Sequence, residues 1–218
     1  MSNLPKPYYE HAGITIYHAD CRDILQHLPK VDLVLTDPPY GIGVSGQKQT
    51  ECLNPNHNRR YHEDLGWDQA RPCKSIFDAI QDISLSQVIW GGNYFADFLP
   101  AKMGWLYWSK AQDGLSMSDG ELAWTSRDAA LRCFTLNRAA LIKDGSAHPT
   151  QKPVELMSWC LSFFPNAETV LDPFMGSGTT LVAAKLQGKR AIGIEREEKY
   201  CEIAVQRLGQ DSLFMEAV

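Results

Sequence analysis

Residues 170–200, VLDPFMGSGTTLVAAKLQGKRAIGIEREEKY, constrain the fold more than any other stretch of the chain. A short apolar strand, a glycine turn, a helical pattern and a second strand follow one another, and Glu195 ends the second strand. Gly176 and Gly178 permit a tight turn that brings the backbone close to a ligand, and the next helix offers free amides at its N-terminus. An acid about 20 residues further on typically binds ribose hydroxyls. The stretch therefore predicts a β-α-β unit that binds a nucleoside.

Three classes of ligand use such a glycine turn, and the neighbouring residues separate them. A P-loop needs Gly-Lys-Ser/Thr, and the GSGTT of residues 176–180 has no lysine there. A dinucleotide site uses G-x-G-x-x-G, whereas this chain reads G-S-G-T-T-L and lacks the third glycine. An adenosine ligand without phosphates remains. S-adenosylmethionine fits, because its ribose needs an acid and its amino-acid end needs polar groups and backbone.

The rest of the chain alternates short apolar segments with helical patterns. This alternation predicts an α/β fold with a mostly parallel sheet covered on both faces. No helical pattern separates residues 121–125 from 130–136, so we expect these two strands to form an antiparallel edge hairpin. The other expected strands are 13–18, 31–36, 87–90, 104–108, 168–171 and 190–194, and the expected helices are 21–28, 74–83, 93–99, 153–164, 178–187 and 197–208.

Length and composition favour one cytoplasmic domain. The 218 residues, 44% of them apolar, suit a single domain over 1–218, with a polar insertion or mobile loop at about 43–73. No run is apolar enough to span a membrane, and the first residues lack a signal-peptide pattern. The net charge of −5 argues mildly against tight non-specific binding to nucleic acid.

The six cysteines are scattered along the chain and form no C-x-x-C pair, which is typical of reduced thiols in the cytosol. Cys52, His57, His62 and Cys73 lie in one polar stretch. Their spacing matches no standard zinc pattern, so we interpret the stretch as a polar loop and expect no metal.

The segment LVLTDPPYG, residues 33–41, places an unusual set of groups at the end of a predicted strand. Two adjacent prolines cannot continue a helix or donate to a sheet, and each pushes the preceding residue toward an extended conformation. Asp37, two carbonyl groups and the Tyr40 ring are thereby held in fixed mutual geometry. A rigid turn would explain these four letters alone, but the separate glycine turn favours a catalytic site.

TDPPYG, HPTQKP and LDPFMGSGTT, in this order, resemble the motifs of the amino-group DNA methyltransferases, which act on adenine N6 or cytosine N4. The order is similar to that of the circularly permuted β-type group, in which the catalytic tetrad precedes the cofactor loop. The resemblance covers residues 13–40 and 86–208. It implies a Rossmann-like fold that uses S-adenosylmethionine and acts on double-stranded DNA.

The resemblance also assigns roles by position. The catalytic tetrad is Asp37, Pro38, Pro39 and Tyr40. The cofactor site comprises Asp172, Phe174, Gly176, Ser177, Gly178, Thr179 and Thr180 of the loop, the ribose acid Glu195, and His148, Gln151 and Lys152 over the methionine moiety, with Asp20 as a looser match near the adenine.

Residues outside these motifs are candidates for the DNA contact. Asn93 follows two glycines where the family often lines the target pocket, although a helix N-cap is an equal interpretation. Arg59 and Arg60 are local basic residues, and Trp67 lies in the same polar loop. Four other tryptophans lie on or beside predicted strands and are expected in the core: Trp90, Trp105, Trp108 and Trp124.

The expected chemistry follows from a poor nucleophile, since the exocyclic amine of the base shares its lone pair with the ring. Asp37 can accept one amino hydrogen and the Pro38 carbonyl the other, which favours a tetrahedral nitrogen in the transition state. Tyr40 can stack on a base that has left the duplex. Asp at the first tetrad position is similar to the adenine-N6 subgroup, and cytosine N4 is the alternative target.

The chain departs from the family in lacking a separate target-recognition region. Only about ten residues lie between the predicted hairpin and HPTQKP, too few for a domain. Recognition is then expected to fall to residues 43–73, to the hairpin or to the second copy in a homodimer. A chain this short fits low specificity, or a phage-type or orphan modification enzyme. An RNA substrate and a catalytically silent DNA-binding module remain open alternatives.

Overall fold

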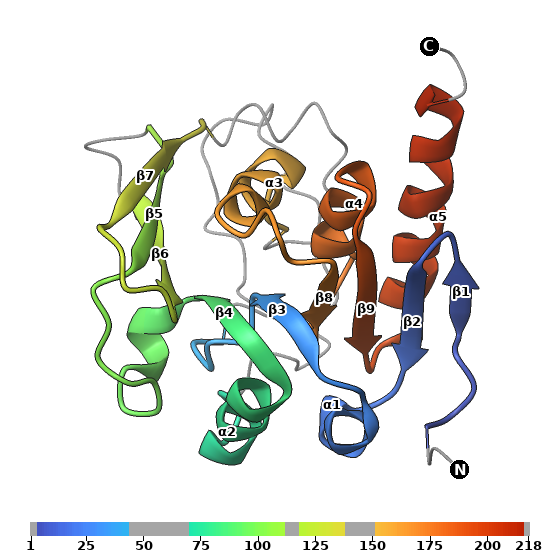
Figure 1. Ribbon diagram of the computed structural model, residues 1–218, viewed down its shortest axis with the longest axis horizontal. Helices are drawn as coiled ribbons and strands as arrows, with labels where there is room; N and C mark the ends of the chain where they lie inside the picture. Colours follow the sequence, from blue (N-terminus) through green and yellow to red (C-terminus); the bar gives the residue numbers. More distant parts are fainter. Residues whose placement is uncertain (1–3, 44–69, 112–117, 138–150, 216–218) are drawn as a thin grey trace, which may run out of the picture.

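A single mixed sheet organises the described part of the chain, which in this computed structural model comprises residues 4–43, 70–111, 118–137 and 151–215. Within these ranges nine strands pair in the order β1-β2-β9-β8-β3-β4-β6-β5-β7 (Figure 1). Their bounds are β1 (Tyr9–His11), β2 (Ile14–His18), β3 (Val31–Thr36), β4 (Ser84–Trp90), β5 (Trp105–Ser109), β6 (Gly120–Thr125), β7 (Arg132–Thr135), β8 (Thr169–Asp172) and β9 (Arg190–Glu195).

Helices cover both faces of this sheet, as the alternating sequence pattern predicts (Figure 1). Apolar side chains of α3, α4 and α5 pack on one face, and those of α1 and α2 pack on the other. The helical elements are α1 (Cys21–Ile24), the 3-10 turn η1 (Leu25–His27), α2 (Lys74–Ile83), the 3-10 turn η2 (Gly92–Phe95), α3 (Val154–Ser162), α4 (Thr179–Leu186) and α5 (Glu198–Met215).

The five central strands are parallel and set the position of the site. Strand β3 pairs with β4 on one side and with β8 on the other, and β9 and β2 continue the parallel run beyond β8. The chain thus proceeds in one direction after β3 and in the opposite direction after β8. In open α/β sheets ligands bind at the carboxyl ends of the strands on either side of such a switch point.

The antiparallel pair lies elsewhere than the sequence predicts. Strands β5 and β6 pair antiparallel, with Trp105 opposite Trp124, and β6 is also antiparallel to β4. Strand β7 does not pair with β6 but runs parallel to β5 at the sheet edge. The expected hairpin of residues 121–136 is therefore wrong. Strand β5, which comes earlier in the chain, lies between the two strands that were expected to pair.

The opposite edge carries a short hairpin that the sequence patterns did not reveal. Strand β1 pairs antiparallel with β2, and Ala12 and Gly13 connect them with φ values of 48° and 79°. Two consecutive positive φ values match the twist of a two-residue hairpin. Three residues are too few for strand β1 to show a readable alternation.

The core confirms most of the expected apolar positions. Trp90, Trp108 and Trp124 are buried, as predicted, and Trp105 is partly buried. Trp90 and Trp108 pack on the face that α3, α4 and α5 cover, and Trp105 and Trp124 pack on the opposite face. Among the described helices, none combines the length and the apolar character that crossing a membrane requires.

Candidate active site

The two sequence motifs meet at the switch point between β3 and β8. Asp37 follows the last residue of β3, and Asp172 is the last residue of β8. The Thr36 hydroxyl donates to Asp172 Oδ1 at 2.7 Å and ties the two strand ends together. Asp172 Oδ1 also accepts from the Phe174 amide at 3.1 Å, which shapes the start of the glycine turn. Burial raises the pKa of the Asp172 carboxyl to about 6.

The glycine turn has the backbone conformation that its sequence predicts. Gly176 and Gly178 have φ values of 49° and 79°, and Gly178 caps the N-terminus of α4. A Cβ at Gly178 would lie 2.7 Å from the Ala204 Cβ, so the turn is packed tightly against α5. A Cβ at Gly176 would meet no atom within 4 Å among the described residues. The turn is therefore open on the side where a ligand would lie.

Glu195 ends β9 beside this turn, as expected. Its Oε2 accepts from the Gly176 amide at 3.0 Å, and its Oε1 accepts from the Glu197 amide at 2.9 Å. Burial raises the pKa of the Glu195 carboxyl. These two backbone bonds hold the carboxylate in place, and its remaining lone pairs are available to a diol.

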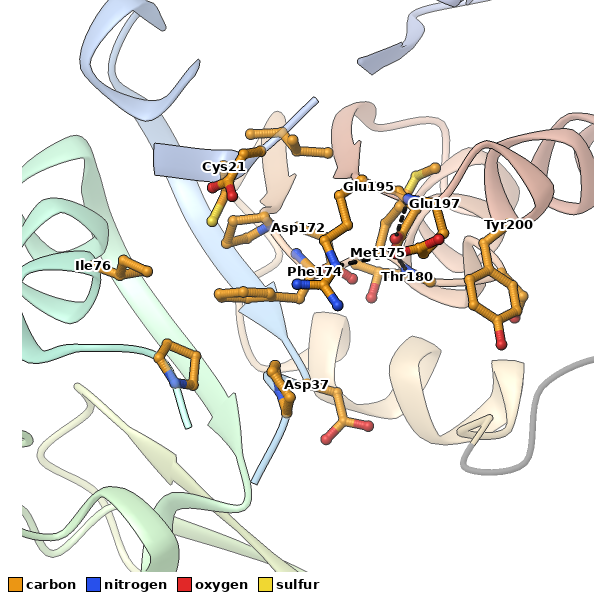
Figure 2. Close-up of a pocket in the computed structure, with 18 of the residues that line it drawn as sticks. Cys21, Asp37, Ile76, Asp172, Phe174, Met175, Thr180, Glu195, Glu197 and Tyr200 are labelled. Atoms are coloured by element: carbon orange, nitrogen blue, oxygen red, sulfur yellow. Dashed lines mark hydrogen bonds and ion pairs between the residues drawn. The ribbon is translucent and has the colours of Figure 1, made fainter. Parts of the chain in front are cut away.

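A cavity of about 430 Å³ lies over the glycine turn and extends to Asp37. Figure 2 shows Glu195, Asp172 and Thr180 gathered around it, with Asp37 at one end. Its wall combines carboxylates, backbone amides and the Phe174 ring. This donor and acceptor set, and the open space over Gly176, fit an adenosine ligand with a charged amino-acid end. Other lining residues from the sequence prediction are Asp20, Gln151, Lys152, Ser177 and Thr179.

Several of these lining residues already have strong partners. Asp20 caps α1 and binds Arg22 through both carboxylate oxygens, at 2.9 and 2.6 Å. Ser177 donates to Gln151 Oε1 at 3.0 Å, which joins the segment before α3 to the glycine turn. Arg207 of α5 donates to the Ser177 carbonyl at 2.8 Å and to the Thr179 hydroxyl at 3.0 Å. No sequence pattern predicts this contribution from α5.

The tetrad acid is held by two side chains. The Tyr40 hydroxyl donates to Asp37 Oδ1 at 2.6 Å, and Lys152 Nζ donates to Asp37 Oδ2 at 2.6 Å. Pro38, the next residue in the chain, is buried, and the Asp37 side chain is 20% exposed. Lys152 thus contacts the tetrad directly, although its sequence motif suggested only a contact with the cofactor.

Lys152 is itself shared between two carboxylates. Its Nζ lies 2.9 Å from Glu121 Oε2, and Glu121 Oε1 lies 2.7 Å from Lys110 Nζ. Burial would lower the pKa of Lys152, but Asp37 and Glu121 raise it well above its usual value. Burial would raise the pKa of Glu121, but Lys152 and Lys110 bring it down to about 2. Burial raises the pKa of Asp37 against the opposing effect of Lys152.

A second cavity of about 360 Å³ opens on the other side of Asp37. The Tyr94 ring lines it and stacks on the Tyr40 ring, with centroids 4.7 Å apart and planes 14° apart. Gly91, with φ of 68°, makes room for Tyr40, because a Cβ there would lie 2.1 Å from Tyr40 Cε1. Asp37, Pro39 and Lys152 line both cavities, so the two meet at the tetrad.

The remaining predicted residues divide into two groups. Asn93 lies in η2, is exposed and lines the second cavity beside Tyr94. Four residues lie outside the described ranges: His148, Arg59, Arg60 and Trp67. The same holds for Cys52, His57 and His62 of the polar stretch considered for zinc.

Sequence reasoning missed Tyr94, Lys110 and Glu121, which all line the second cavity. Glu121 is the single charged residue of GELAWT, and a charged residue near the start of a predicted strand is equally typical of one that faces solvent. Lys110 directly follows β5, where a solvated cation is ordinary. Tyr94 is next to Asn93 in WGGNYF, so the interpretation of that segment as part of the target pocket was the available signal.

This sheet, with a glycine turn and Glu195 on one side of the switch point and the DPPY segment on the other, defines a methyltransferase that uses S-adenosylmethionine. Residues 100–206 match the sequence model of the DNA methylase family N6_N4_Mtase. The chain is 30% identical to "Putative methylase YubD" of Escherichia coli, with 87% of each chain covered. It therefore belongs to the N6/N4 family of DNA methylases.

Other similar proteins agree with this assignment. The chain is 27% identical to the type II methyltransferase M.ScaI of Streptomyces caespitosus, over 94% of this chain and 84% of that protein. The crystal structure of the M1.HpyAVI–SAM complex is 27% identical, with a TM-score of 0.62 over 89% of this chain and 98% of that one. PvuII DNA methyltransferase, described as cytosine-N4-specific, shares the fold at 16% identity and a TM-score of 0.60, over 93% and 88% of the two chains.

Proposed function

We propose that this DNA methyltransferase transfers a methyl group to the exocyclic N6 of an adenine that has left double-stranded DNA, within a specific sequence. One observation carries the proposal: the Asp37 carboxylate lines both a cavity suited to an adenosine ligand and a second cavity walled by aromatic rings. A group-transfer enzyme needs its two substrates to meet at such a point, because orientation supplies much of the rate.

In this proposal the first cavity holds S-adenosylmethionine, which supplies an electrophilic methyl group when bound. Glu195 would accept the ribose hydroxyls, since its carboxylate is fixed by the Gly176 and Glu197 amides. Phe174 would contact the adenine, near Asp20. The other proposed cofactor-binding residues are Asp172, Gly176, Ser177, Gly178, Thr179, Thr180, His148, Gln151 and Lys152.

The proposed chemistry acts on the weakly nucleophilic amine. Asp37 would accept one amino hydrogen and the Pro38 carbonyl the other, which localises the nitrogen lone pair toward the methyl group. These bonds strengthen as the nitrogen becomes tetrahedral and positive, so they stabilise the transition state more than the ground state. A carboxylate has about four acceptor sites, so Asp37 can keep Lys152 and Tyr40 as partners while it accepts from the base.

The second cavity would hold the target base. Base flipping costs a few kcal/mol of lost stacking, which an aromatic surface in the pocket offsets at about 1–3 kcal/mol per base. Tyr40 and Tyr94 form such a surface, and the Tyr94 side chain is 38% exposed. Asn93, beside them, has an amide that can donate to and accept from a base edge. Arg59, Arg60 and Trp67 remain proposed DNA contacts.

The choice of adenine rests on Asp37 at the first tetrad position, which resembles the adenine-N6 subgroup, because Ser is commoner at that position in the cytosine-N4 subgroup. The same acceptors would serve cytosine N4, so the base must be identified by experiment. Unmethylated duplex DNA is incubated with labelled S-adenosylmethionine and digested to nucleosides. Label in N6-methyladenine supports the proposal, whereas label in N4-methylcytosine keeps the acceptor chemistry and rejects the base.

We also propose that residues 1–218 form one methyltransferase domain, with residues 43–73 as an insertion that contributes to target recognition. The described strands on either side of this insertion, β3 and β4, are neighbours in the sheet, which supports a single unit. A homodimer that shares recognition of the DNA stays a prediction. Its test is the mass of the protein in solution with and without a DNA duplex.

A further inference from the structure

Four charged side chains of alternating sign form a continuous chain between the two cavities. Lys110 Nζ lies 2.7 Å from Glu121, Glu121 lies 2.9 Å from Lys152 Nζ, and Lys152 Nζ lies 2.6 Å from Asp37. The exposed fractions of these side chains are 9%, 24%, 4% and 20%, in the same order. Lys110 follows β5, and Glu121 lies in the neighbouring strand β6. Asp37 and Lys152 come from segments far from them in the sequence, so only the fold brings all four together.

Burying such a chain of charges costs free energy of folding. Burying an ion pair removes two charges from water, and replacing the pair by apolar residues is often neutral or stabilising. Glu121 Oε2 is buried, and its charged partner is Lys152 Nζ at 2.9 Å. The free energy lost by burying these charges points to a role other than stability.

The geometry explains what Glu121 can do for Lys152. A lysine ammonium is a compact charge on a flexible stem, so a single partner does not fix its position. Lys152 has a carboxylate on each side, with Asp37 toward the tetrad and Glu121 toward β6. Lys110 in turn holds the other oxygen of Glu121. The ammonium that contacts the tetrad acid is thereby anchored from behind.

We infer that Glu121 is a positioning residue for methyl transfer: it fixes Lys152, and Lys152 fixes the Asp37 carboxylate toward the amine. This inference rests on the proposed role of Asp37. Without Glu121, the Lys152 ammonium follows Asp37 alone, and the carboxylate loses the fixed orientation that transition-state stabilisation requires. Glu121 itself is not among the residues that line the first cavity, so binding of S-adenosylmethionine should change little.

The first test compares Glu121→Gln with Glu168→Gln. Both remove one negative charge, but Glu168 is 83% exposed and precedes β8 at the end of the sheet opposite to the tetrad. The turnover number is measured with saturating duplex DNA and S-adenosylmethionine, and the Kd of S-adenosylmethionine is measured separately. We expect E121Q to lose about 10- to 100-fold in turnover and to keep the Kd within about twofold. E168Q should match the wild type.

A double-mutant cycle tests whether Glu121 acts through Lys152. Lys152→Met is made alone and together with E121Q, and all turnover numbers are measured at saturation. If Glu121 acts only by positioning Lys152, then E121Q adds no further loss in the K152M background. Losses that multiply would show that Glu121 acts independently, and they would overturn the inference.

The inference can fail without the proposed function failing. If Asp37→Ala abolishes transfer while E121Q retains the turnover of E168Q, Asp37 is catalytic and the inference is wrong. If Asp37→Ala retains transfer, the proposed function itself is wrong. Should E121Q prove unstable in a thermal melt, Glu121→Asp keeps the charge on a shorter stem. It should also lose turnover, and wild-type turnover in a folded E121D would again overturn the inference.

Discussion

The two cavities that meet at Asp37 are built in different ways. One end of the first comes from a continuous β-α-β stretch, whose glycine turn and Glu195 are held by backbone amides over short distances in the chain. The second is assembled from β3, η2, β5 and β6, and its wall depends on side chains that meet only in the folded protein. A local site can be recognised in the sequence, whereas an assembled site depends on correct folding of the whole sheet.

A substitution that disturbs only the second cavity should separate DNA methylation from cofactor binding most clearly. Gly91→Ala places a Cβ 2.1 Å from the Tyr40 ring at a φ of 68°. We expect a loss of about 100-fold or more in kcat/KM for DNA, because Tyr40 and Asp37 must move. The Kd of S-adenosylmethionine, measured by calorimetry, should stay within about twofold.

Gly188→Ala is the matched control for this substitution. Gly188 has a similar φ of 66°, but a Cβ there meets no atom within 4 Å among the described residues. The variant carries the same backbone strain, worth about 1 kcal/mol, without the contact with Tyr40. If G188A lost as much activity as G91A, general destabilisation would explain both, and the special role of Gly91 would be rejected.

The converse experiment weakens cofactor binding in the first cavity and leaves the second cavity intact. Glu195→Gln removes the charge that we propose accepts the ribose hydroxyls, and hydrogen bonds to charged groups contribute about 1.5–3 kcal/mol. We therefore expect the Kd of S-adenosylmethionine to rise about 10- to 100-fold, with turnover at saturation largely kept. Asp20→Asn should have a smaller effect on this Kd, since both oxygens of Asp20 already bind Arg22.

A milder change tests the aromatic wall of the second cavity. Tyr94→Ala removes the ring stacked on Tyr40, and loss of about 1–2 kcal/mol of stacking predicts a 5- to 30-fold fall in kcat/KM for DNA. Tyr94→Phe keeps the ring and should stay near the wild type. Equal activity of the alanine and phenylalanine variants would show that Tyr94 does not contact the base.

The last prediction concerns Asp172 and the pH dependence of stability rather than activity. Its pKa of about 6 lies above the unfolded value of 3.8, so the folded protein binds the proton more tightly. The free energy of unfolding therefore falls as pH rises from about 4 to 6, by about 2–3 kcal/mol from this group. This pH dependence is measured by urea unfolding of the wild type and of Asp172→Asn at pH 4.5 and pH 7. A pH-independent difference between the two proteins would contradict it.

The sequence predicts the first cavity well because its determinants are local. The strand 31–36 that leads to Asp37 and the helix 74–83 match the structure residue for residue. The glycine turn, α4 and Glu195 lie where their spacing places them. In each case the hydrophobic pattern, the turn residues and the capping residues agree with one another. Local sequence predicts the position of an element well under that condition.

The second cavity could not be predicted in the same way. Lys152 and Asp37 are 115 residues apart in the chain, and neither neighbourhood indicates that they pair. Glu121 reaches them only because β6 adds to β4 in the antiparallel direction, whereas sequence patterns favoured pairing of β6 with β7. The order of strands decides which side chains surround the tetrad, and strand order follows from long-range packing rather than from periodicity.

In the proposed mechanism one carboxylate, Asp37, joins the two cavities in a single chemical step. Single-turnover transfer of labelled methyl from S-adenosylmethionine to unmethylated duplex DNA, compared between the wild type and Asp37→Ala, tests it most directly. We expect N6-methyladenine from the wild type, a loss of at least about 100-fold in the variant, and an unchanged Kd for S-adenosylmethionine. Transfer by Asp37→Ala at the wild-type rate would contradict it.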